Sequence, residues 1–177
     1  MSVDRTPEEL LIKSLTASFV PLLDTGQEND NYFHLDLSIN NEELQAIDIS
    51  SSQSLGGYVN SKLAKNNAAV GYGGYAERRD IYSRSAYFNQ NNPDTQRNIH
   101  LGIDLWCAAG TSVLAAYDGT VHSFKDNRNY GDYGPCVILK HDVKGFIFFS
   151  LYGHLSKETL EKLTIDQKVI AGEPIGH

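Results

Sequence analysis

His100-Leu101-Gly102-Ile103-Asp104 is the stretch of this 177-residue chain that says most about its fold and chemistry. An imidazole and a carboxylate are both good zinc ligands, with bonds of about 2.0 to 2.2 Å. A divalent metal held by His100 and Asp104 would lower the pKa of a bound water to about 7, which makes that water a nucleophile. The alternative is a structural pair at the end of a strand, in which Asp104 accepts the imidazole proton.

Three further segments follow this motif along the chain, at residues 110–121, 133–141 and 151–156. The first contains Asp118-Gly119, the second ends at His141, and the third contains Tyr152-Gly153-His154. In this order the four segments resemble the lysostaphin-type (LytM-like) zinc metallopeptidases, a family of glycyl-glycine endopeptidases. The resemblance favours the metal-ligand interpretation of the first motif over the structural one.

The resemblance implies a role for each of three residues. His100 and Asp104 would bind Zn²⁺, and His154 would act beside the metal by transferring a proton or stabilising an oxyanion. The implied reaction is zinc-dependent hydrolysis of a peptide bond, on a peptidoglycan-type or other peptide substrate. No substrate-binding residue is assigned by the resemblance.

The family's later His-x-His motif, which supplies a third zinc ligand and a second catalytic histidine, has no counterpart before the final residue, His177. Because a catalytic zinc normally has three protein ligands, we expect this chain alone to be a weak metal binder and a weak or inactive peptidase. We do not assign the third-ligand role to His177, which lies outside such a motif. A domain cut before its last strand would also expose a sheet edge, where a second copy or a partner chain could pair.

Hydrophobic alternation predicts a mainly β fold. Strands are expected over residues 111–116, 136–142 and 146–152, with hairpin turns at Asp118-Gly119 and at residues 142–145. We therefore expect an antiparallel β-sheet domain over residues 70–177, which the resemblance implies to be of the lysostaphin type, preceded by a small α+β region over residues 1–69.

The expected N-terminal region contains one clear helix signal. Thr6-Pro7-Glu8-Glu9 combines an N-cap, a proline at the first helical position and a capping box. Residues 32–39 alternate well enough for a strand. Residues 50–67, rich in Ser, Gly and Asn, are expected to form a loop or a weak helix.

Composition narrows the class of protein. A hydrophobic content of 41% is sufficient for a core, and a net charge of −7 with scattered basic residues gives no surface for nucleic acid. No apolar run approaches the roughly 18 residues that cross a bilayer, and no export signal is visible at the N-terminus. We therefore expect a cytoplasmic chain that binds neither nucleic acid nor membrane. Its two cysteines, Cys107 and Cys136, are expected to be reduced.

A cytoplasmic location conflicts with a peptidoglycan substrate, so a second interpretation stays open. The segment from Val70 to Tyr82 is also similar to the peptidase-like module between a kinase-like and an aminotransferase domain in some large bacterial fusion proteins. Under this alternative the chain is a non-catalytic binding or linker module of a larger metabolic enzyme. The aromatic and arginine side chains of this segment could line a peptide groove, although structural packing is the favoured explanation.

Overall fold

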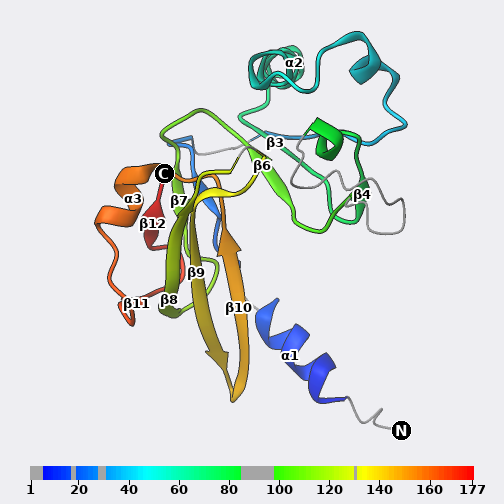
Figure 1. Cartoon of the computed structure of the whole chain (residues 1–177). Coiled ribbons are helices and arrows are strands. Elements are labelled where there is room, and N and C mark those ends of the chain that lie inside the picture. The colour runs from blue at the N-terminus through cyan, green and yellow to red at the C-terminus, as the bar shows by residue number, and fades with distance from the viewer. Residues whose placement is uncertain (1–5, 17–18, 28–30, 85–97, 130) are drawn as a thin grey trace, which may run out of the picture. The chain divides into compact units, whose positions relative to one another are not determined.

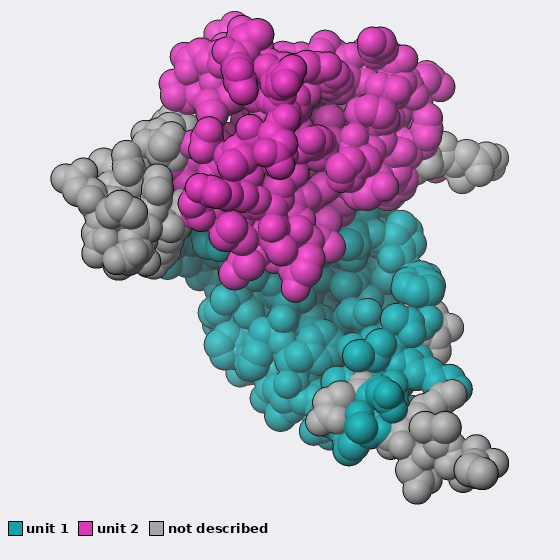
Figure 2. Space-filling model, turned by 90° about the vertical axis from the view of Figure 1, so that its right-hand side faces the viewer, with its two compact units in different colours: residues 1–24, 110–177 teal, residues 25–109 magenta. Residues whose placement is uncertain are grey.

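The computed structural model describes residues 6–16, 19–27, 31–84, 98–129 and 131–177. Its contacts divide the chain into two compact units, one of residues 1–24 and 110–177 and the other of residues 25–109 (Figure 2). We call them the first and the second unit. Among the described residues no helix is both long enough and apolar enough to cross a membrane.

This division differs from the boundary expected between residues 69 and 70. The N-terminal segment joins the C-terminal sheet because Leu23 pairs with Val113, and because the Tyr117 hydroxyl donates to the carbonyl of Leu15. Residues 70–73, by contrast, pair with strands of the second unit. Long-range strand pairing of this kind leaves no local mark on the sequence, and the expected domain boundary after residue 69 stays a prediction.

The first unit is mainly β, as expected (Figure 1). One sheet has the order β10-β9-β8-β11 and another the order β1-β7-β12, and all their pairs are antiparallel. The elements are α1 (Pro7–Leu15), β1 (Leu23–Asp24), β7 (Ser112–Leu114), β8 (Gly119–Asn127), β9 (Gly134–Val143), β10 (Phe146–Tyr152), α3 (Lys157–Glu161), β11 (Lys168–Val169) and β12 (Pro174–Gly176).

The hairpin of β9 and β10 confirms the expected strands and turn. Val143 pairs with Phe146, and the two residues between them, Lys144 and Gly145, have φ of 54° and 87°. Two consecutive positive φ angles mark the turn geometry whose twist matches that of antiparallel strands. The turn fixes the register that places alternate β9 side chains in the core.

The hairpin expected at Asp118-Gly119 is wrong. Residues 112–114 form β7, but this strand pairs with β1 and β12, whereas β8 pairs with β9 and β11. Gly119 is needed for close packing instead, because a Cβ there would lie 2.5 Å from the carbonyl oxygen of Lys140. The local turn signal was correct for a change of direction but not for the pairing.

The core of the first unit comes from alternate residues of β8 and β9. Val121, Val137 and Leu139 are fully buried and pack with Leu155. Burying a side chain of this size contributes about 1.5–3 kcal/mol. Strand β10 forms one edge of this sheet. The exposed fractions of its residues Ile147, Phe149 and Leu151 are 57%, 53% and 48%. Pairing of a partner at this edge stays a prediction.

The second unit combines a helix with short strands. Its sheet has the order β2-β3-β6, in which β2 runs parallel to β3 and β3 antiparallel to β6, while β4 pairs with β5. The elements are β2 (Tyr32–His34), η1 (Glu42–Ala46), α2 (Ser52–Lys65), β3 (Val70–Gly73), β4 (Glu77–Arg78), η2 (Ile81–Arg84), β5 (Ile99–His100) and β6 (Asp104–Trp106).

Helix α2 resolves the choice between loop and weak helix in favour of a helix of 14 residues. The Ser51 side chain caps its first turn by accepting the N–H of Ser54. Leu55, Val59 and Leu63, four residues apart, are buried on one face. A stripe of three aliphatic side chains against the sheet therefore outweighs two helix-weakening glycines.

The N-terminal helix α1 confirms the capping signal. The Thr6 hydroxyl accepts the N–H of Glu9, and the Glu9 carboxylate accepts the N–H of Thr6. Strand β2 is shorter than expected and ends at His34. Both cysteines are free thiols, with Cys136 buried and Cys107 half-buried.

Candidate metal centre

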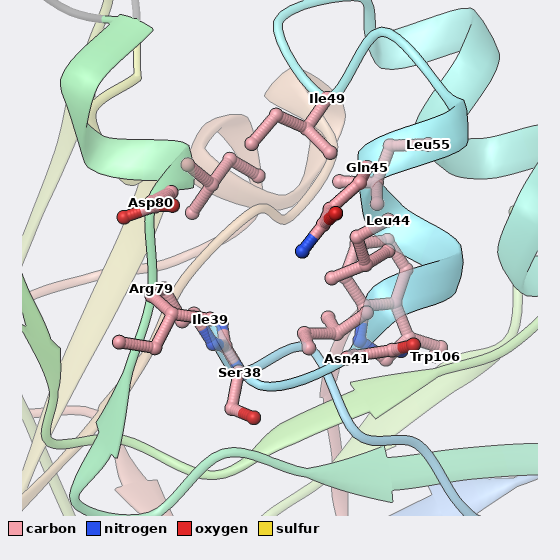
Figure 3. Close-up of a pocket in the computed structure, with 12 residues that line it drawn as sticks. Ser38, Ile39, Asn41, Leu44, Gln45, Ile49, Leu55, Arg79, Asp80 and Trp106 are labelled. Carbon is pink, nitrogen blue, oxygen red and sulfur yellow. The ribbon is translucent and has the colours of Figure 1, made fainter.

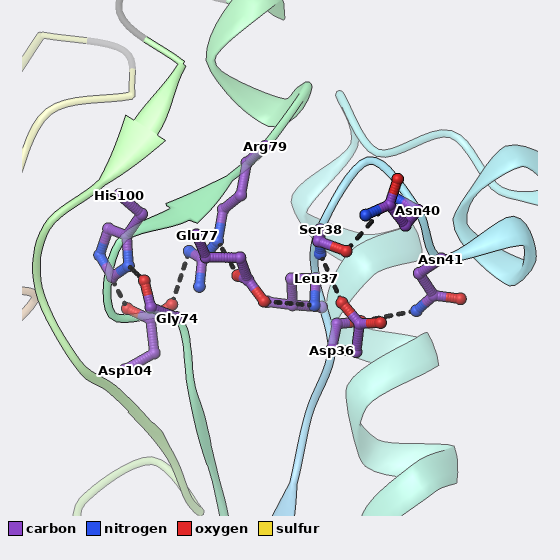
Figure 4. Close-up of polar contacts among 10 residues, drawn as sticks. All are labelled: Asp36, Leu37, Ser38, Asn40, Asn41, Gly74, Glu77, Arg79, His100 and Asp104. Carbon is purple, nitrogen blue, oxygen red and sulfur yellow. Dashed lines mark hydrogen bonds and ion pairs between the residues drawn. The ribbon is translucent and has the colours of Figure 1, made fainter.

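His100 and Asp104 come together at the junction of two short strands. His100 ends β5, Asp104 begins β6, and the three residues between them turn the chain so that both side chains face one point (Figure 4). Nε2 of His100 lies 3.5 Å from Oδ1 of Asp104. Both side chains are partly exposed, at 19% and 24%. Solvent and ions therefore reach the pair.

A backbone contact fixes the state of the imidazole. Nδ1 of His100 lies 2.9 Å from the carbonyl oxygen of Gly74. A carbonyl only accepts hydrogen bonds, so Nδ1 must carry a proton. In the neutral ring Nε2 is then an acceptor, and it faces the carboxylate oxygen Oδ1, which is also an acceptor. A proton on Nε2 or a cation shared by both atoms turns this repulsion into attraction.

The donor set and its spacing fit zinc. Two tetrahedral zinc ligands with bonds of about 2.0–2.2 Å lie about 3.4 Å apart, close to the 3.5 Å between Nε2 and Oδ1. A hydrogen bond from Nδ1 to a backbone carbonyl is also the usual support of a metal-binding histidine. Gly102 keeps the nitrogen accessible, since a Cβ there would lie 3.1 Å from Nε2.

Arg79 supports the other side of Asp104. Its Nη1 lies 2.7 Å from Oδ2, the carboxylate oxygen that faces away from His100, and its Nε donates to the carboxylate of Glu77 (Figure 4). Glu77 in turn accepts the backbone N–H of Leu37 at 3.2 Å. Burial lowers the pKa of Arg79, but the carboxylates of Asp104 and Glu77 outweigh burial and raise it above its ordinary value. Arg79 is therefore a permanent cation.

Arg79 and Glu77 lie in a segment that was expected to pack or to line a groove and to have no part in the metal site. The structure shows them in direct or indirect contact with Asp104. The only sequence signal was two adjacent arginines shortly before the His100 motif. Nothing in that signal distinguishes the buried Arg79 from its exposed neighbour Arg78.

His154 belongs to the first unit and is described by its own surroundings. It follows β10, its N–H donates to the carbonyl of Tyr133 at 2.7 Å, and its side chain is exposed. Its φ of 58° is in the left-handed region, which costs a non-glycine residue about 1–2 kcal/mol. Such backbone strain is enriched at functional sites.

The comparisons with known proteins bear on this arrangement. Residues 98–177, which include His100, Asp104 and His154, match the family model described as peptidase family M23. This segment is therefore similar to peptidase family M23. Neither the curated proteins nor the solved structures gave a match. The similarity to this family agrees with the mainly antiparallel β fold and makes this part of the chain a metallopeptidase-like domain.

The M23 segment does not coincide with one compact unit. Residues 98–109, with His100 and Asp104, belong to the second unit, and residues 110–177 belong to the first. Across the described parts of the chain, no three side chains of His, Cys, Asp or Glu are grouped so that they could hold one metal ion. The structure thus groups two of the three predicted site residues.

The other histidines of the M23 segment have structural surroundings. His141 is fully buried, with Nδ1 2.9 Å from the carbonyl oxygen of Asp118 and Nε2 2.7 Å from the hydroxyl of Ser150. Exposed His122 lies at the irregularity between β8 and β9 and contacts Ser123. His177 donates its backbone N–H to Thr159. These contacts give His141 a structural role and leave His122 on the surface.

A pocket of about 130 Å³ lies in the second unit (Figure 3). Its wall is mostly apolar, with Leu44, Ile49 and Ile81 among its members, and it also includes Arg79 and Trp106. The Trp106 indole N–H, which is buried, has no hydrogen-bond partner among the described residues. Arg79 is thus shared by the pocket wall and by the polar network around Asp104.

Proposed function

We propose that this chain carries a zinc metallopeptidase site in which His100 and Asp104 bind the metal and His154 assists the reaction. The proposal rests on one observation. Nε2 of His100 lies 3.5 Å from Oδ1 of Asp104, while Nδ1 of His100 is hydrogen-bonded to the carbonyl of Gly74. That arrangement leaves two acceptors directed at one point, which a divalent cation satisfies. The similarity of residues 98–177 to peptidase family M23 supports it.

Each of these residues has a defined part in peptide-bond hydrolysis. Zinc, when bound, supplies a Lewis acid that polarises a carbonyl and makes water a better nucleophile. His100 contributes a neutral imidazole, held in the correct tautomer by Gly74. Asp104 contributes one carboxylate oxygen while Arg79 holds the other. His154, exposed and without a ring hydrogen bond among the described residues, is available to transfer a proton or bind an oxyanion.

We further propose that the chain as given binds zinc weakly and is a weak or inactive peptidase, because two protein ligands fall short of the usual three. The substrate class that fits the family is a peptide, of peptidoglycan type or otherwise. The alternative, a non-catalytic binding or linker module of a larger enzyme, is favoured by one observation. No third ligand accompanies His100 and Asp104 among the described residues.

Zinc titration followed by ¹⁵N resonances of the histidine rings tests the metal site, because it reports weak binding at a named nitrogen. We expect Zn²⁺ to move the Nε2 resonance of His100 and to leave that of His122 in place. The variants His100→Ala and Asp104→Asn should each weaken zinc binding by at least about 100-fold, the usual scale for loss of one ligand from a small set. His122→Ala is the matched control.

Two results would contradict the proposal. One is zinc binding that is equally tight in His100→Ala and in the unmodified chain, which would place the metal elsewhere. The other is the absence of any zinc-dependent change at His100 at millimolar zinc. Hydrolysis of a glycine-rich peptide by the unmodified chain, lost in His154→Ala, would instead replace the expectation of weak activity by a working peptidase.

A further inference from the structure

Arg79 is the most deeply buried charged side chain among the described residues of the second unit, with 5% of its surface exposed. Removing a guanidinium from water costs several kcal/mol unless partners compensate. Here the compensation comes from two carboxylates, Asp104 on one side and Glu77 on the other. One guanidinium and two carboxylates leave one negative charge in the cluster, which favours an additional cation beside Asp104.

The two oxygens of Asp104 face different partners. Oδ2 lies 2.7 Å from Arg79 Nη1, and Oδ1 lies 3.5 Å from His100 Nε2. An arginine on one oxygen limits rotation of the carboxylate about its last bond. The oxygen directed at His100 is consequently held in place before any metal arrives.

Arg79 is itself fixed from two directions. Its Nε donates to Glu77, whose other oxygen accepts the backbone N–H of Leu37. Gly74 also packs against it, because a Cβ on Gly74 would lie 2.0 Å from Arg79 Nη2 and 2.7 Å from His100 Nδ1. The same glycine whose carbonyl accepts the hydrogen bond from His100 therefore leaves the space that Arg79 occupies.

We propose that Arg79 is a positioning residue of the zinc site, which orients Asp104 so that Oδ1 is presented to the metal, and that Glu77 anchors Arg79 for this purpose. This inference rests on the proposed function. Metal ligands are commonly oriented by outer partners of this kind, and their loss weakens metal binding by about 10- to 100-fold. A lysine cannot replace Arg79, because a single ammonium lacks the planar fork that spans two carboxylates.

Cobalt(II) titration of the full chain tests the inference, since the visible spectrum of cobalt reports ligand geometry as well as affinity. Arg79→Lys keeps the positive charge and Arg79→Gln removes it. We expect both to weaken Co²⁺ binding by about 10-fold or more and to change the visible spectrum. The neighbouring exposed residue gives the matched controls, Arg78→Lys and Arg78→Gln, which should bind Co²⁺ as the unmodified chain does.

Glu77→Gln is the second variant, for the case that the Arg79 variants do not fold. Glutamine retains an oxygen for the N–H of Leu37 but loses the charge that holds Arg79. We expect a weaker Co²⁺ affinity, reduced by a few-fold, with an unchanged circular dichroism spectrum of the metal-free protein.

The possible outcomes separate the two proposals. If the unmodified chain binds no Co²⁺ at His100, the proposed metal site is wrong and the role of Arg79 falls with it. If binding depends on His100 but Arg79→Lys matches the unmodified chain in affinity and spectrum, the metal site stands and the positioning role is wrong. If Arg79→Lys binds Co²⁺ as the unmodified chain does and Arg79→Gln does not, Arg79 contributes only its positive charge, and its positioning role is wrong.

Discussion

Two histidines of this chain, His100 in the second unit and His141 in the first, place Nδ1 2.9 Å from a backbone carbonyl oxygen. They differ at the other nitrogen. In His141 it meets the Ser150 hydroxyl, which donates to it, and the ring is fully buried. In His100 it meets a carboxylate that cannot donate while ionised, and the side chain is partly exposed.

This difference separates a histidine with a structural role from the proposed metal ligand. A ring whose two nitrogens are both satisfied within the protein gains nothing from a metal and is retained for stability. A ring whose second nitrogen faces another acceptor is stabilised by a cation that the chain itself does not supply. The two histidines should therefore respond in opposite ways to substitution, one in stability and the other in metal binding.

The largest expected effect is on stability at His141. Its replacement by Ala leaves the Ser150 hydroxyl and the Asp118 carbonyl without this partner and opens space beside Phe148. We expect the free energy of unfolding, measured in urea by circular dichroism, to fall by about 3 kcal/mol. Zinc binding at His100 should be unchanged. A loss below about 1 kcal/mol would contradict the structural role.

A smaller loss of stability is expected from Gly74→Ala. This variant changes the residue whose carbonyl holds His100, and so it tests the difference between His100 and His141 directly. The substitution places a Cβ where φ is 93° and where Arg79 and His100 already lie. We expect a loss of about 2 kcal/mol in stability together with weaker zinc binding. Gly26→Ala, at φ of 71° with nothing within 4 Å of the new Cβ, is the control. Equal zinc affinity in both variants would show that the crowding at Gly74 is harmless.

The smallest stability effect is expected at His100 itself. His100→Ala removes one hydrogen bond to Gly74, but it also removes the repulsion between Nε2 of His100 and Oδ1 of Asp104, which are both acceptors. We expect the free energy of unfolding without metal to change by no more than about 1 kcal/mol. Urea unfolding in the presence of a chelator measures it. A loss as large as that of His141→Ala would mean that both histidines are structural.

Local sequence patterns predicted a good part of the fold. The capping box at Thr6 and Glu9, the strands of the β9–β10 hairpin and its turn were all expected, because each depends on residues a few positions apart. The pairing partner of β7 was not predictable, since β1 and β12 lie far from it in the chain. For the same reason the division into two compact units could not be read from local patterns.

The candidate site follows the same rule. The His100 motif was visible because its two members are four residues apart, and the structure brings them together. Arg79 and Gly74 could not be recognised as parts of the site from the sequence. Arg79 follows β4 and contacts Asp104 in β6, whereas Gly74 follows β3 and contacts His100 in β5, so both contacts join segments that are distant in the chain. An arginine in a sequence looks the same whether it is buried between carboxylates or exposed to solvent.

The sequence by itself determined which residue types are available as proposed zinc ligands, the resemblance of the segment that contains them to peptidase family M23 and the short elements on which they lie. The tertiary structure alone decided which nitrogen of His100 is available and which oxygen of Asp104 faces it. The physical reason is that ligand identity is covalent, whereas the tautomer of an imidazole and the orientation of a carboxylate depend on hydrogen-bond partners brought from elsewhere in the chain. Gly74 is the hydrogen-bond partner of His100, and Arg79 is the ion-pair partner of Asp104.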